Sequence, residues 1–499
     1  MKKLIAFLAF LGLFMASCND DDTTVVNNPD PEPVTYTSGT ADFSNYVAIG
    51  NSLTAGYSDA ALFIDGQTNS FPNMLAGNFA LAGGGDFSIP FMADNLGGAT
   101  LGGQTILGNR LILSFATGSP SPVPVSGQGA TEISNTLTGP FNNMGVPGAK
   151  SYHLVAPGYG NVAGVATGAA NPYYARFASS GSATVIGDAA VQNPSFFSLW
   201  IGNNDILGFA TSGGAGVDQT GNLDPSTYGS NDITDPNVFA SVLDGLLQTL
   251  TANGADGVLM NIPDVTTIPY FTTVPYNPVP LDEATAALLN GAYAAYNGGL
   301  AQLQLGGAIS ADELARRTIS FSAGASNAVV LIDEDLTDLT GFNPALINMR
   351  QATPEDLLVF TSQTIIGTLA NPNDPTSING VAVPLADQWV LTPEEQMAVA
   401  TAQVSYNQTI AALAQVYDVA LVDANAFLTT FAETGFPLSD GSTVRATYGT
   451  GGGFSLDGVH PSPRGYALLA NLMVEAINAK YGSNLPGVNP LDFTGLYLQ

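Results

Sequence analysis

The chain has 499 residues, of which 45% are hydrophobic, so it is long enough for one large domain with insertions or for two to three small domains. It carries 41 acidic and 11 basic residues, a formal net charge of -30, which repels phosphate backbones and argues against a nucleic-acid partner. Charged residues make up only 10% of the chain, a low share for a cytosolic enzyme, and this favours an exported protein.

The N-terminal segment resembles a bacterial lipoprotein signal. Lys2 and Lys3 give it a positive start, and residues 4–15 form an apolar segment too short to span a bilayer. Small residues then precede Cys18, the only cysteine, so no intrachain disulfide can form. We expect residues 1–17 to be removed and Cys18 to be lipidated. An ordinary secretory signal with a chance cysteine is the alternative.

Residues 18–40 are predicted to form a disordered acidic and proline-rich tether. They are rich in Asp, Asn, Pro and Thr, a composition that cannot build a core. The acidic run at residues 20–22 resembles the surface-export signal of lipoproteins in Bacteroidetes-type bacteria, although a solvated start to a linker explains it equally well. We therefore expect an exported lipoprotein of the outer membrane or cell surface, held to the membrane by its N-terminal lipid.

Residues 41–499 are predicted to form one domain in which strands and helices alternate. Short apolar runs indicate strands, and 3.6-residue periodicity with capping residues indicates helices. The predicted strands are residues 46–49, 195–201, 257–261, 329–333 and 419–422, and the predicted helices are residues 235–253, 282–304, 393–416 and 465–480. This alternation predicts an α/β fold with three α/β/α layers around a parallel, flavodoxin-like sheet. Residues 60–140 and 265–392 are expected to be long insertions near the site.

The sequence Gly50-Asn51-Ser52-Leu53-Thr54 follows the first predicted strand directly. A serine at a strand-to-helix turn has an accessible hydroxyl, and the backbone N–H groups of the helix start can stabilise an anion. The block is not the Gly-x-Ser-x-Gly turn of α/β-hydrolases, because Thr54 replaces the second glycine. Taken alone, Ser52 could equally be an ordinary helix cap.

The sequence Asp457-Gly458-Val459-His460-Pro461 lies near the other end of the chain. An aspartate three residues before a histidine can accept a hydrogen bond from the imidazole and stabilise its protonated form. The only other histidine is His153, for which we expect a structural or substrate-contact role. Too few His and Cys residues are present for a nitrogen and sulfur metal site, so we expect no metal and no cofactor.

Two further blocks offer hydrogen-bond donors. Gly148 ends the sequence Asn143-Met144-Gly145-Val146-Pro147-Gly148, and its amide can approach a substrate without a clashing side chain. Asn204 follows the predicted strand 195–201, and its side-chain amide can donate to a developing oxyanion. Each block taken alone is also compatible with a plain turn.

In residue type and chain order, the four blocks resemble the SGNH/GDSL hydrolases. The resemblance implies the fold given above, a catalytic triad and an oxyanion hole: Ser52 is the nucleophile, His460 the general base and Asp457 the residue that orients it, with the Ser52 amide, the Gly148 amide and the Asn204 side chain as oxyanion donors. The family's Gly-Asp-Ser-Leu reads Gly-Asn-Ser-Leu here, so Asn51 replaces an aspartate outside the triad.

The resemblance implies a serine esterase or lipase that hydrolyses carboxylic esters. Its substrate would be a lipid, a small acyl ester or an acetylated glycan. A glycan O-acetyl esterase of the same family is one alternative. A non-catalytic, surface-binding lipoprotein that retains the fold is another.

Overall fold

A computed structural model describes residues 34–116 and 120–498 of the protein. The chain divides into two units, Met1–Thr35 and Tyr36–Gln499, and the described helices and strands all belong to the second. Cys18, the predicted signal and most of the predicted tether lie outside the described residues. Among the helices of the described part, none has the length and apolar character needed to cross a membrane.

The folded chain begins a few residues earlier than residue 41. Thr37 donates its backbone N–H to the side chain of Asn484 at 2.6 Å, and the backbone N–H of Thr40 donates to the carbonyl of Tyr481 at 2.8 Å. Both partners belong to the end of the last helix and the loop after it. The C-terminal end of the predicted tether is therefore part of the fold, because a segment distant in sequence supplies its hydrogen bonds.

The main sheet has five strands, all parallel, in the order β16-β9-β8-β1-β7. Its strands are β1 (Tyr46–Gly50), β7 (Asn143–Gly145), β8 (Phe196–Trp200), β9 (Asp256–Met260) and β16 (Ala420–Val422). The prediction of an α/β fold around a parallel sheet is confirmed. The strand β7 was not predicted, because Asn-Met-Gly is too short and too polar to give an apolar run.

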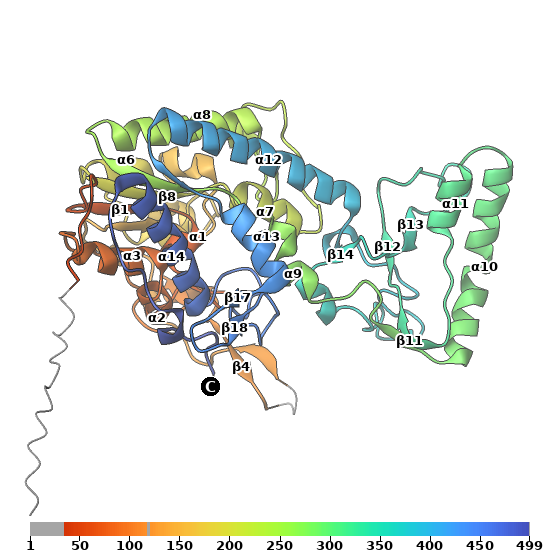
Figure 1. The fold of residues 1–499 in the computed structure, drawn as a ribbon. Helices are drawn as coiled ribbons and strands as arrows, with labels where there is room; N and C mark the ends of the chain where they lie inside the picture. The colour runs from red at the N-terminus through yellow and green to blue at the C-terminus, as the bar shows by residue number, and fades with distance from the viewer. Residues whose placement is uncertain (1–33, 117–119, 499) are drawn as a thin grey trace, which may run out of the picture. The chain divides into compact units, whose positions relative to one another are not determined.

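Helices cover both faces of this sheet (Figure 1). The side chains of β1 alternate, so Val47 and Ile49 pack into one core while Tyr46 and Ala48 pack into the other. The core on the Val47 side includes α6 (Val185–Ala190), α8 (Pro236–Thr251) and α12 (Pro393–Val416). The core on the Tyr46 side includes α3 (Phe71–Ala80) and α14 (Pro463–Tyr481). The three predicted layers are thus present.

Capping residues explain where the long helices begin. Asp235 accepts hydrogen bonds from the N–H groups of the first turn of α8, and Pro236 fills its first position. Thr392 and Glu395 form a reciprocal capping box at the start of α12. The predicted helix 235–253 is confirmed within two residues at its C-terminal end.

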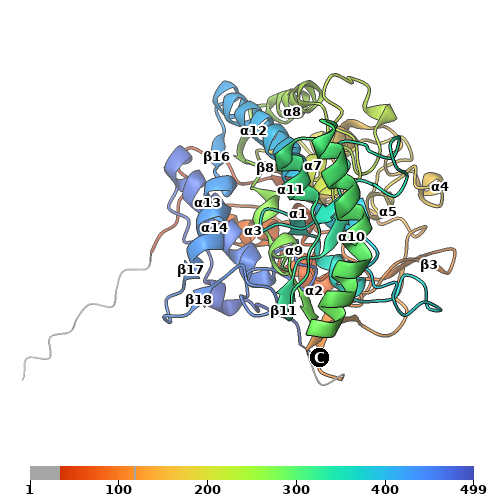
Figure 2. The same ribbon diagram turned by 90° about the vertical axis from the view of Figure 1, so that its right-hand side faces the viewer.

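A separate core, called the second core from here on, lies away from the main sheet within the predicted insertion 265–392. Its elements are α10 (Glu283–Leu305), α11 (Ala311–Arg317), β10 (Val279–Leu281), β11 (Gly324–Asn327), β12 (Val330–Ile332) and β13 (Met349–Gln351). Figure 2 shows α10 and α11 in front. The strand expected at 329–333 exists as β12, but it pairs antiparallel with β13, has one further bridge from Leu331 to Leu385, and is not part of the main sheet.

The predicted insertion 60–140 contains one helix of the main fold, α3, together with small peripheral sheets. Phe71, Leu75 and Phe79 of α3 are buried against the main sheet and α14. The peripheral elements are α2 (Ile64–Thr68), β2 (Ala99–Leu101), β3 (Gln104–Leu107), β4 (Leu111–Ser114), β5 (Ser121–Pro124) and β6 (Thr131–Glu132). The helix α3 was not predicted, because the surrounding stretch is rich in Gly and Asn and its composition indicates a loop.

The remaining elements are short. They are α1 (Ser52–Ala55), η1 (Ser151–Val155), α4 (Val162–Val165), α5 (Pro172–Ala175), α7 (Asn204–Thr211), η2 (Pro225–Thr227), η3 (Val265–Thr267), α9 (Pro269–Thr272), β14 (Leu357–Leu358), η4 (Phe360–Thr364), η5 (Asp387–Trp389), β15 (Val390–Leu391), α13 (Ala424–Thr434), β17 (Phe436–Pro437), β18 (Thr443–Val444) and η6 (Pro490–Asp492). Two of them, α1 and α7, begin directly after the carboxyl ends of β1 and β8 and carry candidate site residues.

Candidate active site

Ser52 stands at the tight turn between β1 and α1. The turn requires a glycine before it, because a Cβ at Gly50 would lie 2.4 Å from the carbonyl oxygen of Trp200 on β8. Asn51 then caps α1, its Oδ1 accepting a hydrogen bond from the N–H of Leu53 at 3.0 Å. Ser52 is only 6% exposed, so its hydroxyl is held in a defined place beside the pocket described below.

Asn51 is the position at which the motif departs from Gly-Asp-Ser-Leu. Its side chain is buried, and its Nδ2 donates to Oδ1 of Asn203 at 3.2 Å. An ionised aspartate could cap α1 equally well but could not donate this second hydrogen bond. The asparagine therefore links the first block to the block that contains Asn204, and the departure does not disturb the turn that carries Ser52.

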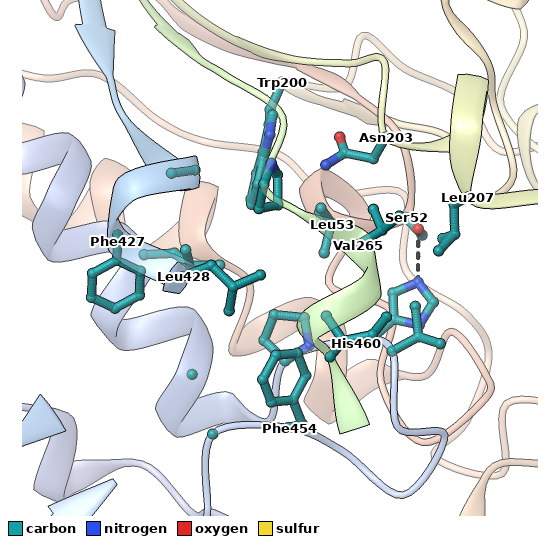
Figure 3. Close-up of a pocket in the computed structure, with 18 of the residues that line it drawn as sticks. Ser52, Leu53, Trp200, Asn203, Leu207, Val265, Phe427, Leu428, Phe454 and His460 are labelled. Atoms are coloured by element: carbon teal, nitrogen blue, oxygen red, sulfur yellow. Dashed lines mark hydrogen bonds between the residues drawn. The ribbon is translucent and has the colours of Figure 1, made fainter. Parts of the chain in front are cut away.

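Ser52, His460 and Asp457 form one hydrogen-bonded chain. Nε2 of His460 lies 2.8 Å from Oγ of Ser52, and Nδ1 lies 2.9 Å from Oδ2 of Asp457. Figure 3 shows Ser52 and His460 facing one another across this contact. An ionised carboxylate only accepts hydrogen bonds, so Nδ1 carries the proton and the bare Nε2 accepts the serine O–H. In this arrangement His460 can remove the proton from Ser52.

The Asp457 carboxylate accepts several hydrogen bonds. Its two oxygens accept hydrogen bonds at 2.8–3.0 Å from the Ser455 hydroxyl, the backbone N–H groups of Ala60, Val459 and His460, and the His460 ring. Burial alone would raise the pKa of Asp457, but the charge of His460 and these hydrogen bonds outweigh it and bring the pKa to about 2. The group is therefore ionised at neutral pH.

Backbone and side-chain donors gather at the adjoining strand ends. Gly148 has φ +80°, a left-handed conformation that a side chain would strain. Within the described residues, the amides of Gly148 and Ser52 donate to no protein acceptor. Asn204 and Ser52 both line the pocket described below, and Nδ2 of Asn204 donates to the carbonyl of Ala149 at 2.9 Å. A primary amide has two N–H bonds, so one remains for a ligand.

The loop of Gly148 is fixed to the helix of Asn204. The N–H and hydroxyl of Ser151 donate to the two carboxylate oxygens of Asp205, at 2.8 and 2.6 Å. The backbone N–H of Val146 donates to the carbonyl of Gly50 at 3.0 Å and sets the loop against the end of β1. The donor groups are thus held by buried contacts before any ligand binds, as an oxyanion site requires.

Sequence patterns did not identify two residues that support the loop of Asp457 and His460, called the histidine loop from here on. The ring of Tyr57 packs against the imidazole of His460 with the ring centroids 4.6 Å apart. Asp59 is buried, its backbone N–H donates to the hydroxyl of Ser455 at 2.9 Å, and its Oδ1 accepts the N–H of Leu456 at 2.8 Å. No spacing signal could have paired Asp59 with residues almost 400 positions later.

His153 is not part of this group. Its Nδ1 accepts the backbone N–H of Lys150 at 3.0 Å, and its ring stacks on Tyr159 with the centroids 4.5 Å apart. Burial, together with the charge of Lys150, lowers the pKa of His153 to about 4. The imidazole is therefore neutral at physiological pH and has a structural role in the 3-10 turn η1.

An apolar pocket extends from Ser52 and His460 between the carboxyl end of β8 and the helices α13 and α14. It encloses about 800 Å³, part of it open to solvent. Its apolar lining includes Trp200, Leu207, Val265, Ile268, Phe427, Leu428, Phe431, Phe454, Leu468 and Leu469. Figure 3 shows Phe427 and Leu428 at the opposite end of the pocket from Ser52. An apolar lining with a few polar groups at one end is typical of a small-molecule site.

The predicted insertion 265–392 reaches this pocket only through its first residues. Val265 and Ile268 line it, and the N–H of Tyr270 donates to the carbonyl of Gly458 in the histidine loop at 2.9 Å. Residues 60–140 contact the site through Ala60, whose backbone N–H donates to the carboxylate of Asp457. Neither the second core nor the peripheral sheets contribute to the lining of the pocket.

Comparison with known proteins returns only remote similarity. No protein family and no curated protein matches the chain. Among solved structures, an acetyl-xylooligosaccharide esterase variant from Geobacillus stearothermophilus is 10% identical, with a TM-score of 0.31 over 88% of this chain and 96% of that chain. An alpha/beta hydrolase enzyme from the metagenome of Lake Arreo, Spain, gives the same identity, TM-score and coverage.

Proposed function

We propose that the protein is a serine hydrolase that cleaves carboxylic esters, of the SGNH/GDSL type that the four sequence blocks resemble. The observation that carries this proposal is the continuous hydrogen-bonded chain from Ser52 through His460 to Asp457, with contacts of 2.8 and 2.9 Å. A serine, an imidazole and an ionised carboxylate in this order form an activated nucleophile. We expect the amide of Gly148 and the side chain of Asn204 to supply the oxyanion site.

The proposed reaction has two half-reactions. His460 takes the Ser52 proton as Oγ attacks the ester carbonyl, and the tetrahedral oxyanion accepts hydrogen bonds from the amides of Ser52 and Gly148 and from the side chain of Asn204. The protonated imidazole then gives its proton to the leaving alcohol, which leaves an acyl-serine. Water, deprotonated by His460, attacks this acyl group and regenerates Ser52 with release of the acid. Asp457 stays ionised throughout and holds the imidazole.

The pocket favours an apolar acyl group over an acetyl group on a glycan. Aromatic and aliphatic side chains line the space next to Ser52, whereas recognition of a sugar needs many polar contacts. Each CH₂ group buried in such a pocket contributes about 0.8 kcal/mol. We therefore propose an esterase or lipase for medium-chain acyl esters, and glycan O-acetyl esterase activity is the less favoured alternative.

Labelling by a fluorophosphonate probe tests the nucleophile. The wild-type protein should be labelled at Ser52, and Ser52→Ala should abolish both labelling and hydrolysis of a chromogenic ester. Ser455→Ala is a matched serine-to-alanine control that should keep the label at Ser52, because the Ser455 hydroxyl contacts Asp457 and the N–H of Asp59 and does not line the pocket. An unlabelled wild-type protein without esterase activity would instead indicate the non-catalytic, surface-binding lipoprotein.

A chain-length series tests the acyl preference. Rates for p-nitrophenyl esters should rise from acetate to octanoate, and Leu428→Trp should reduce the octanoate rate by about 10-fold or more while sparing acetate. Leu428 lies at the far end of the pocket, so a short acyl group does not reach it (Figure 3). A higher rate on acetylated xylan than on octanoate would favour the glycan esterase.

The proposal extends to the location of the enzyme. We propose that Cys18 is lipidated after removal of residues 1–17 and that the enzyme is anchored at the outer membrane or cell surface. The support is the signal-like sequence before Cys18 and the acidic run after it. Cys18→Ser should release the protein from the membrane fraction and abolish incorporation of labelled palmitate. Retention of both in the variant would contradict the anchor.

A further inference from the structure

Three carboxyl groups converge at the junction between the second core and the main domain. Glu334 follows β12, Asp387 begins η5 and Glu395 lies in the first turn of α12. One oxygen from each lies within 4.8 Å of the others. The three residues come from segments that are separate in sequence and meet only in the folded protein.

Two carboxylate oxygens of this cluster are buried without an N–H or hydroxyl donor. Oδ1 of Asp387 and Oε1 of Glu395 are both inaccessible to solvent and accept no hydrogen bond from such a group, although Oε2 of Glu395 accepts the N–H of Thr392 at 2.6 Å. Glu395 is only 7% exposed. A buried carboxylate oxygen without a partner is unfavourable, and such groups in folded proteins bind a proton, a cation or a metal ion.

No basic side chain neutralises the cluster. In the described part of the chain, none of the three carboxylates pairs with a lysine or arginine. The nearby Arg316 pairs instead with Asp333 and with Glu394, at 2.9 and 3.0 Å. Without a bound cation, three carboxyl groups therefore lie close together with no positive charge between them, which is unfavourable at a largely buried site.

The geometry points to a calcium ion held by Glu334, Asp387 and Glu395. Only oxygen ligands are present, and these are the ligands of hard divalent cations. Ca²⁺ binds oxygens at about 2.3–2.6 Å, so two ligands on opposite sides of one ion can lie about 5 Å apart. The three oxygens lie within 4.8 Å of one another, so all of them can reach one such ion. Mg²⁺ demands a near-ideal octahedral shell and keeps several of its waters, so a largely buried set of carboxylates suits it less well.

The proposed ion would join the second core to the main domain. The loop that follows α7 also packs on the site, because a Cβ at Gly214 would lie 1.8 Å from Oε1 of Glu395 and one at Gly213 would lie 2.4 Å from the carbonyl oxygen of Asp387. A side chain at Gly214 would displace the carboxylate of Glu395, and one at Gly213 would clash with the backbone of η5. Calcium bound here would hold the turn after β12, η5, α12 and the end of α7 together.

Titration calorimetry of the purified protein, treated with a chelator and then dialysed, tests the proposal. We expect one Ca²⁺ per chain with Kd of about 1 mM or tighter, weaker binding of Mg²⁺, and a higher Tm when Ca²⁺ is added. Glu395→Gln should weaken Ca²⁺ binding by at least about 10-fold. Glutamine can still accept the N–H of Thr392, so the capping box and the fold should be retained.

Glu394→Gln is the matched control. It removes the same charge from the neighbouring residue, whose side chain pairs with Arg316 and does not belong to the cluster, so Ca²⁺ should bind as in the wild type. Glu334→Gln, at an exposed ligand, gives a second weakened variant in which packing is not at risk. No heat of Ca²⁺ binding in the wild type, or equal affinity in Glu395→Gln, would overturn the proposal in favour of carboxyls that only share protons.

Discussion

The carboxyl edge of the main sheet and the second core are built from the same chain but handle charge in different ways. At the sheet edge, Ser52, Asn204 and the histidine loop present polar groups to an apolar pocket. In the second core, Arg350 is 1% exposed and is held by the carboxylates of Asp333 and Asp356. The first region leaves donors and a nucleophile for a ligand, whereas the second uses its charges for internal pairing. Substitutions in the two regions should therefore affect different properties.

The largest expected effect is that of His460→Ala. Without the imidazole, Ser52 has no base and the leaving alcohol has no acid, so kcat should fall by about 10⁴-fold or more. Tm should change little, because the His460 side chain lies at the mouth of the pocket and not in a core. Steady-state kinetics on a medium-chain ester, with circular dichroism as the folding control, measure both. A variant that kept even one tenth of the wild-type kcat would assign the base to another group.

Asn204→Ala should reduce kcat by about 10²–10³-fold and leave KM nearly unchanged. Its amide is proposed to donate mainly to the oxyanion, so the substitution should weaken stabilisation of the transition state and leave substrate binding nearly unchanged. Ser52 should still react with a fluorophosphonate, more slowly, because the nucleophile and base are intact. If KM rose and kcat stayed constant, Asn204 would be a substrate-binding residue and the sheet edge would lack that oxyanion donor.

Arg350→Met tests the second core. The change leaves Asp356 buried without its cationic partner, whose Nη1 and Nη2 now lie 2.6 and 2.7 Å from its oxygens. Breaking such a buried pair costs about 3–5 kcal/mol. We expect faster hydrogen exchange in β12 and β13, with kcat within about 2-fold of the wild type in the folded protein. A kcat loss as large as that of Asn204→Ala would remove the distinction between the two regions.

The two regions also differ in how far the sequence predicts them. Apolar runs that end at a glycine, an aspartate or shortly before a proline identified four strands of the main sheet. Because parallel strands end at one edge, Ser52 and Asn204 could be placed together. The strand β7 and the helix α3 lack a strong periodic signal, so sequence patterns did not reveal them. The hairpin β12–β13 was predicted only as a strand, since pairing depends on contacts distant in sequence.

The support of the site by Asp59 is another such long-range contact, and it gives the smallest predicted effect. Burial raises the pKa of Asp59 to about 7, the N–H of Leu456 opposes this rise, and the charge of Asp457 adds to it. The folded protein therefore keeps a proton that the unfolded chain releases near its ordinary pKa of 3.8. This contribution to stability is complete below about pH 4 and is lost as the pH rises through about 7.

Asp59→Asn removes this titration and keeps a carbonyl oxygen to accept the N–H of Leu456. Between about pH 5 and pH 8 the unfolding free energy of the wild type should fall by about 2–3 kcal/mol more than that of the variant, because one pKa unit corresponds to about 1.4 kcal/mol. Urea unfolding at both values measures the difference, and the kcat of the variant should stay close to that of the wild type. Parallel pH profiles would mean that Asp59 is ionised in the folded protein. The negative charge next to Asp457 would then be a permanent part of the site, present at every pH at which the enzyme works.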